Sequence, residues 1–265
     1  MTLNDVDHQD LQRARRLLEN PGLAARLAAV IGMPLEKAIA ILPRRVTDEI
    51  GRLTQGAIHV SLRSALATLR SPDRHGGPQR ASEGWHTAAA SLMGAASGFL
   101  GAPALAIELP ISLTIMMRSI ADIARSEGAD LEVPATQLDC VQVLALGGST
   151  GSGEGAGPAY LATREALAQA TSDAINHVGR RGLRRTDAPA LVRLITTVAE
   201  RFSVNVTERA AAQAIPVIGA ASGALVNGLF IDHFQGMARG HFIIRRLERK
   251  YGGEVVQEAY THYAA

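Results

Sequence analysis

Apolar residues recur at helical spacing along most of the chain. From residue 44 to residue 70 they return every three or four positions, beginning with Val46, Ile50, Leu53 and Ala57. This period places them on one face of a helix. The strict alternation of apolar and polar residues that marks a half-buried strand is almost absent. The pattern therefore predicts an all-α fold of about nine or ten helices.

The predicted helices are separated by segments rich in proline and glycine. Pro21 and Gly22 interrupt the first helix, and Gly128 is a natural end for another. Residues 138–146 are apolar without a clear period, which fits a strand or a short buried helix. The expected helices span residues 9–31, 44–70, 111–126, 160–178, 191–202, 241–251 and 254–263.

Two long stretches, residues 84–107 and 210–231, contain no Asp, Glu, Lys or Arg. Pro103 and Pro110 break the first, so we expect two helices with a turn there rather than one rod. Both stretches are long enough to span a bilayer, but alanine, glycine and serine dilute their hydrophobicity. We expect buried hairpins; hairpins that insert into a membrane and a spanning pair are the alternatives.

Each uncharged stretch contains the sequence GAASG, which places two glycines on one helix face. Small faces of this kind let helices approach closely. We therefore predict a helical bundle with two central Gly/Ala-rich apolar hairpins wrapped by amphipathic helices. An N-terminal helical segment, residues 1–43, is expected to continue into a main domain, residues 44–265. The expected helix-packing glycines are Gly94, Gly98, Gly219, Gly223 and Gly228.

Composition and charge limit the partners of the chain. The chain is 47% hydrophobic but only 4% aromatic, and its net charge of +2 does not indicate nucleic acid as a partner. Cys140 is the single cysteine, which excludes an internal disulfide and suits a reducing cytoplasm. The polar start MTLNDVDHQD does not resemble a secretory signal. We expect a cytoplasmic protein.

Three segments carry a family resemblance. They are GADL at 128–131, LALGGSTGS followed by AYLATREALA at 144–168, and IPVIGAASGALVNGLFIDHFQGMARGHFIIRRLERKYG at 215–252. Together they resemble the EcsC protein family over roughly residues 40–263. That family is named for a member encoded beside an ABC transporter. The resemblance implies a helical bacterial protein and membrane association, and it supplies no catalytic residues.

The glycine-rich loop at 147–158 matches two catalytic patterns only superficially. GGSTG would make Ser149 a nucleophile, but that motif needs a strand before it in an α/β sheet. The loop also lacks the G-K-[ST] ending of a phosphate cradle, and Glu154 would repel an anion. A flexible loop is the expected interpretation, and no cofactor is predicted.

Glu108 and Asp232 each follow an uncharged stretch, where a carboxylate must be paired, protonated or exposed. If the hairpins pair, the two could meet, with His233 and His241 as neighbours and metal binding as one use. Structural pairing is the alternative, with Arg118, Arg164 or Arg239 as the counter-ion. The candidate polar site comprises Glu108, Asn227, Asp232, His233 and His241.

Basic residues cluster in a loop and near the C-terminus. They suit either solvated helix faces or contacts with anionic lipid headgroups. The candidate membrane-facing residues are Arg180, Arg181, Arg184, Arg185, Arg245, Arg246, Arg249 and Lys250.

These features lead to one expected function and two alternatives. We expect a non-enzymatic cytoplasmic protein, peripheral on the inner face of the cell membrane. It would meet an anionic lipid membrane or a membrane protein complex through its apolar hairpins and basic faces. The first alternative is a ligand-binding, metal-binding or hydrolytic protein with a site between the hairpins. The second is a soluble scaffold that forms a homo-oligomer through its small-residue faces.

Overall fold

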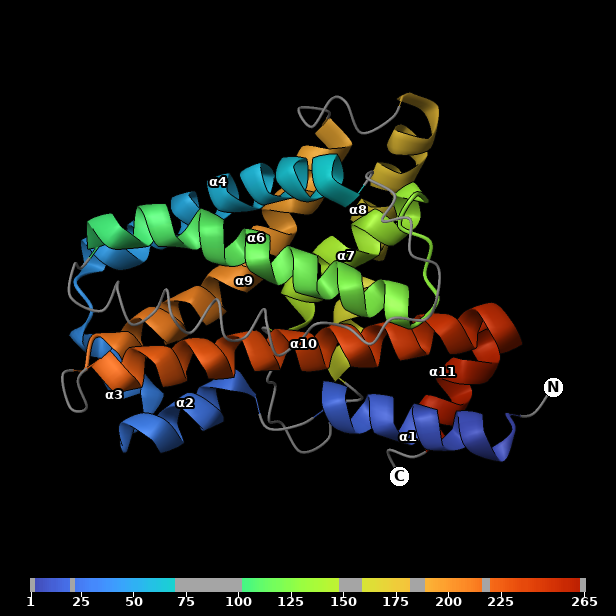
Figure 1. Cartoon of the computed structure of the whole chain (residues 1–265), viewed down its shortest axis with the longest axis horizontal. Coiled ribbons are helices and arrows are strands. Elements are labelled where there is room, and N and C mark those ends of the chain that lie inside the picture. Colours follow the sequence, from blue (N-terminus) through green and yellow to red (C-terminus); the bar gives the residue numbers. More distant parts are fainter. Residues whose placement is uncertain are drawn as a thin grey trace.

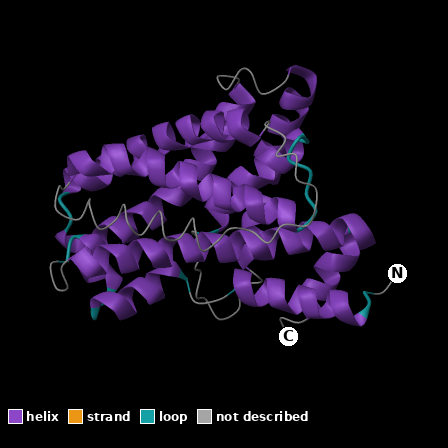
Figure 2. Ribbon diagram, in the orientation of Figure 1, coloured by secondary structure: helices purple, strands orange, loops and turns teal. Residues whose placement is uncertain are grey.

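The protein is an assembly of helices in the computed structural model, which describes residues 3–19, 22–69, 102–147, 159–181, 189–215 and 220–262. Within these ranges ten helices and no strand are present (Figure 1, Figure 2), which confirms the all-α prediction. The helices are α1 (Asp5–Leu18), α2 (Leu23–Ile31), α3 (Leu35–Ile41), α4 (Arg44–Leu69), α6 (Ala102–Ser126), α7 (Pro134–Leu146), α8 (Ala159–Arg181), α9 (Pro189–Gln213), α10 (Ala220–Tyr251) and α11 (Gly253–His262).

Capping residues fix several helix ends. The side chain of Asn4 accepts a hydrogen bond from the backbone N–H of Asp7 at 2.8 Å and so begins α1. Gly32, Gly128 and Gly252 follow α2, α6 and α10 with φ of +70°, +72° and +90°. This left-handed conformation favours glycine, so the predicted stop at Gly128 is confirmed.

The long helix α10 is the spine of the bundle and lies against α1, α2, α6, α7, α9 and α11. It joins the second uncharged stretch to the basic segment at 241–251, which the sequence predicted as a separate helix. That prediction of two helices was wrong. Gly236 and Gly240 each lower the stability of this helix by about 1 kcal/mol, and packing against neighbouring helices offsets the loss.

Helix α7 resolves the ambiguous apolar segment. Every residue from Gln137 to Leu146 is buried, and α6, α8, α9 and α10 all contact the helix. A helix surrounded on all sides needs no polar face, so its sequence lacks the usual period. Within the described residues, α7 therefore belongs to the centre of the bundle.

The predicted break at Pro110 does not occur, because α6 runs through this proline. A proline inside a helix costs about 3 kcal/mol through its missing N–H and its ring. Helix α6 packs against both α4 and α10, which outweighs that cost. The carbonyl of Pro110 accepts hydrogen bonds from the hydroxyls of Thr114 at 2.7 Å and Ser61 at 3.4 Å.

None of the helices in the described ranges combines the length and the apolar character that a membrane span requires. The first GAASG copy, with Gly94 and Gly98, lies outside those ranges, as does Gly219. Gly223 and Gly228 belong to α10 and are partly exposed.

The N-terminal helices share the core of the rest of the chain. Leu11 of α1 and Leu27 of α2 are fully buried in the same apolar cluster as α7 and α10. Helix α1 lies close against α10 at Gly240. A Cβ atom there would lie 2.6 Å from Cγ of Leu18 and 3.0 Å from the carbonyl oxygen of Ala14. The helices can be this close only because residue 240 has no side chain.

We therefore expect Gly240→Ala to lower the free energy of unfolding by about 1–3 kcal/mol, because α1 must move away from α10. Gly236→Ala is the matched control, since its Cβ would meet nothing nearer than Leu17 at 3.8 Å. It should raise stability by up to about 1 kcal/mol through helix propensity. Urea denaturation of both variants measures the difference, and equal effects would contradict the close packing.

Candidate functional site

The two carboxylates at the ends of the uncharged stretches do not meet. Glu108 is 6% exposed and pairs with the buried guanidinium of Arg209, which also donates to the hydroxyl of Ser112 at 3.3 Å. Burial lowers the pKa of Arg209 to about 10. Asp232 is 60% exposed and pairs with Arg26 of α2 at 2.6 Å.

Both acids therefore have their own arginine partners, and neither partner was among the three counter-ions that the sequence suggested. Arg209 marks the start of the second uncharged stretch, and its side chain turns inward to Glu108 rather than outward to solvent. The geometry of Glu108 is that of a closed structural pair.

The remaining candidate polar residues hold helices together. The ring of His233 donates from Nε2 to the carbonyl of Gly147 at 3.0 Å. Asn227 accepts from the side chain of Gln213 at 3.1 Å, across α9 and α10. His241 contacts Tyr160 of α8. Among the described residues, no group of three or more His, Cys, Asp or Glu side chains is placed to hold a metal ion.

The basic residues near the end of α10 also bond within the fold. Arg245 pairs with Asp139 of α7, Arg246 with Asp10 and Lys250 with Asp7 of α1. Arg249 donates to the carbonyl of Glu127 at 3.2 Å. This part of α10 therefore bonds to other helices of the same chain, and acidic side chains offset most of its positive charge. Of the loop cluster, Arg184 and Arg185 lie outside the described residues, and so do the side chains of Arg180 and Arg181.

A groove runs along α8 beside the end of α10, and we call it the α8 groove. It consists of two adjoining cavities of about 690 Å³ and 240 Å³, which share Arg164, Ala168 and Arg245. Helix α8 forms one wall; α7, α10 and α11 contribute the others. The lining residues are Asp139, Gln142, Leu161, Arg164, Glu165, Ala168, Thr171, Ser172, Ile175, Asn176, Arg245, Glu248, Gly253, Glu254 and Gln257.

One face of α8 lines the whole groove. Its lining positions follow one another at three- and four-residue intervals, which is the spacing of a single helix face. The apolar ones, Leu161, Ala168 and Ile175, are seven residues apart. Ala168 is exposed, and the other two are partly buried. The groove therefore has a row of apolar side chains that is exposed at Ala168, while Leu161 and Ile175 also pack against the core.

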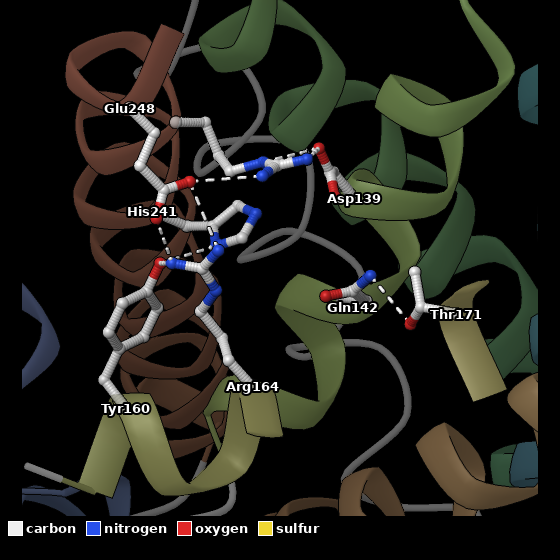
Figure 3. Close-up of polar contacts among 8 residues, drawn as sticks. Asp139, Gln142, Tyr160, Arg164, Thr171, His241 and Glu248 are labelled. Carbon is white, nitrogen blue, oxygen red and sulfur yellow. Dashed lines mark hydrogen bonds and ion pairs between the residues drawn. The ribbon is translucent and has the colours of Figure 1, made fainter. Parts of the chain in front are cut away.

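A chain of alternating charges forms the inner wall of the groove. Arg164 donates to both carboxylate oxygens of Glu248, at 2.6 Å and 3.2 Å. Arg245 links Glu248 to Asp139, because its guanidinium donates to a carboxylate oxygen of each, at 3.1 Å and 2.9 Å. Figure 3 shows the side chains of Asp139 from α7, Arg164 from α8 and Glu248 from α10 converging on this wall. Burial raises the pKa of Asp139, although Arg245 opposes the shift.

Tyr160 and His241 lie behind this wall. Arg164 donates to the Tyr160 hydroxyl at 3.4 Å, and the hydroxyl lies 3.0 Å from Nδ1 of His241 (Figure 3). The hydroxyl and Nδ1 share this hydrogen bond. The other ring nitrogen, Nε2, has no hydrogen-bond partner among the described residues. Burial, followed by the charges of Arg164 and Arg245, holds the pKa of His241 well below its ordinary value.

Two further acids, at the rim of the groove, differ from the paired acids of the inner wall. Asp139 and Glu248 are balanced by two arginines, whereas Glu165 and Glu254 have no salt-bridge partner in the described part of the chain. Glu165 belongs to α8 and Glu254 to α11, so surplus negative charge lies on both sides of the larger cavity.

A family model described as the EcsC protein family matches residues 7–247, which is most of the chain. The chain belongs to the EcsC protein family. The match extends the resemblance seen in the sequence to the N-terminal helices α1–α3. No curated protein and no solved structure matches significantly.

The sequence alone did not reveal the groove. Arg164 stood out only as a possible counter-ion, while Glu248, Asp139 and Tyr160 did not stand out at all. One local signal was present, the seven-residue spacing of Leu161, Ala168 and Ile175. Another wall comes from α11, which begins more than 70 residues after α8 ends, and no local pattern predicts that approach.

The buried His241 predicts an acid-sensitive fold. Because its folded-state pKa is depressed, the unfolded chain binds the proton first, and stability is lost as pH falls below the ordinary value of 6.5. We expect His241→Gln to make the free energy of unfolding less dependent on pH, by at most about 1.4 kcal/mol per pH unit. Denaturant melts between pH 7 and pH 5 measure it, with the exposed His262→Gln as control. Parallel curves for wild type and His241→Gln would contradict the assignment.

Proposed function

We propose that the chain is a non-enzymatic docking protein that associates with a membrane protein complex by binding a helical segment of a partner along the α8 groove. The observation that carries the proposal is the row of Leu161, Ala168 and Ile175, which lines the groove along one face of α8. Helices that pack along one another repeat their contacts every seven residues. Recognition of a helix in a groove uses such anchors.

The length of the groove supports a helical occupant. The lining face runs from Leu161 to Asn176, which corresponds to about 22 Å of helix at 1.5 Å per residue. A drug-sized ligand is usually enclosed on most of its surface. Here Ala168, Glu165 and Ser172 are exposed along the floor and rim. A long open channel suits a polypeptide segment better than a small molecule.

The side chains of the inner wall are held in fixed positions before a partner binds. The paired contacts of Arg164 with Glu248, and of Arg245 with Asp139, hold the walls of the groove in place. Side chains that are already fixed lose little conformational entropy when a partner binds. The polar residues of the wall thus serve recognition by keeping the channel open and shaped.

Blocking the groove tests this function. We expect Ala168→Trp to abolish sedimentation of the purified chain with membrane vesicles from the source cell, because the indole fills the channel. Ala166→Trp is the matched control, since Ala166 is exposed on α8 but does not line the groove. Protease treatment of the vesicles should also abolish binding. Equal binding by both variants would overturn the proposal.

Contact with lipid is a second candidate, favoured by the start of α10. Leu225 is half exposed there, within the stretch from residue 210 to residue 231 that carries no charge. Gly223 and Gly228 are partly exposed beside it. Such a surface can enter the interfacial region of a bilayer at little electrostatic cost.

We expect Leu225→Asp to weaken flotation of the chain with anionic liposomes, because the new carboxylate is repelled by the headgroups and must leave water. Val6→Asp is the control; Val6 is also exposed but lies on α1. The measurement is the bound fraction at low and moderate salt. An unchanged fraction for Leu225→Asp would eliminate this lipid contact.

A further inference from the structure

The charges around the α8 groove identify what kind of helix it accepts. We propose that the occupant is an amphipathic helix with basic side chains, Lys or Arg, on both flanks of an apolar stripe. This inference rests on the docking function proposed above and specifies its partner. It comes from the surplus acids Glu165 and Glu254, which lie on opposite walls of the larger cavity.

The arginines of the wall do not make the groove an anion site. Every carboxylate contact of Arg164 and Arg245 is to Glu248 or Asp139, at hydrogen-bond distance. An acidic ligand would have to displace these carboxylates, leaving charges without partners in a partly buried wall. It would also approach Glu165 and Glu254, which carry the same charge as the ligand.

A basic helix meets none of these obstacles. Its apolar stripe can lie on Leu161, Ala168 and Ile175, while its flanking cations reach Glu165 on one side and Glu254 on the other. This is the arrangement by which flanking charges select partners in paired helices. The wall pairs stay intact, so only the two unpaired rim carboxylates gain partners.

The two ends of the groove differ, which gives the basic helix a direction. Glu165 and Glu254 line the larger cavity, toward the start of α8. The smaller cavity has no unpaired acid: beside the paired charges of the inner wall it is lined by uncharged hydrogen-bonding groups, including Gln142, Ser172 and Asn176. The cations of the occupant therefore belong at the end beside α11, and uncharged polar residues suit the other end.

Three stapled peptides of about 16 residues, enough to span the groove, test the inference. They share a seven-residue Leu/Ala stripe and differ only in their flanking residues, which are Lys, Gln or Glu. We expect the order of affinity Lys, then Gln, then Glu, measured by fluorescence anisotropy. The preference for Lys should shrink when salt is raised from about 0.05 M to about 0.5 M, because exposed charges are screened.

Charge removal identifies the residues responsible. The double variant Glu165→Gln and Glu254→Gln should weaken the Lys peptide roughly tenfold at low salt, as expected for two exposed ion pairs. The control removes two exposed acids elsewhere, Glu132→Gln and Glu200→Gln, with the same change in net charge. It should leave affinity unchanged.

The outcomes separate this inference from the docking function. If the Glu peptide binds as tightly as the Lys peptide, or if none of the three binds while Ala168→Trp still abolishes vesicle binding, the basic occupant is wrong and the docking groove stands. If the Lys peptide binds equally to wild type and to Ala168→Trp, the groove itself is not the binding surface and both proposals fail.

Discussion

The alternation of charges from Asp139 through Arg245 and Glu248 to Arg164 is the interaction on which the arrangement of α7, α8 and α10 depends. Helix α7 is buried on all sides, so its one acid, Asp139, needs a cation from a neighbouring helix. Arg245 provides it from α10, and Glu248 then links α10 to α8. Such pairs add little net stability, but losing one partner leaves a buried charge at considerable cost. They define where the helices sit.

Successive parts of α10 make different contacts. Its first third is uncharged and packs against α9, where Arg209 and Glu108 form a buried pair beside Phe230. Its middle approaches α1 at Gly240. Its last turns are basic, and their cations pair with acids of α1 and α7. Glu248, in the same turns, pairs with Arg164 of α8. The apolar start of α10 and the groove beside its end thus lie at opposite ends of one helix.

Local patterns predicted most of the helices but not the polar contacts between them. The period of apolar residues identified α4 and α9, composition identified α8, and Gly128 correctly marked the end of α6. The same rules failed where tertiary packing overrode them, as at Pro110, which α6 tolerates between α4 and α10. They were also uninformative in α7, because a helix buried on every side has no polar face to reveal its period.

Hydrogen–deuterium exchange of the full chain, free and bound to native membrane vesicles, tests most directly whether the α8 groove is the functional surface. Docking should stabilise the helices that line it, because amides in a bound helix exchange only when it opens locally. The account predicts slower exchange in residues 161–176 and 253–257, with no change in residues 189–200 of α9, none of which line the groove. Protection confined to other helices, with residues 161–176 unchanged, would contradict it.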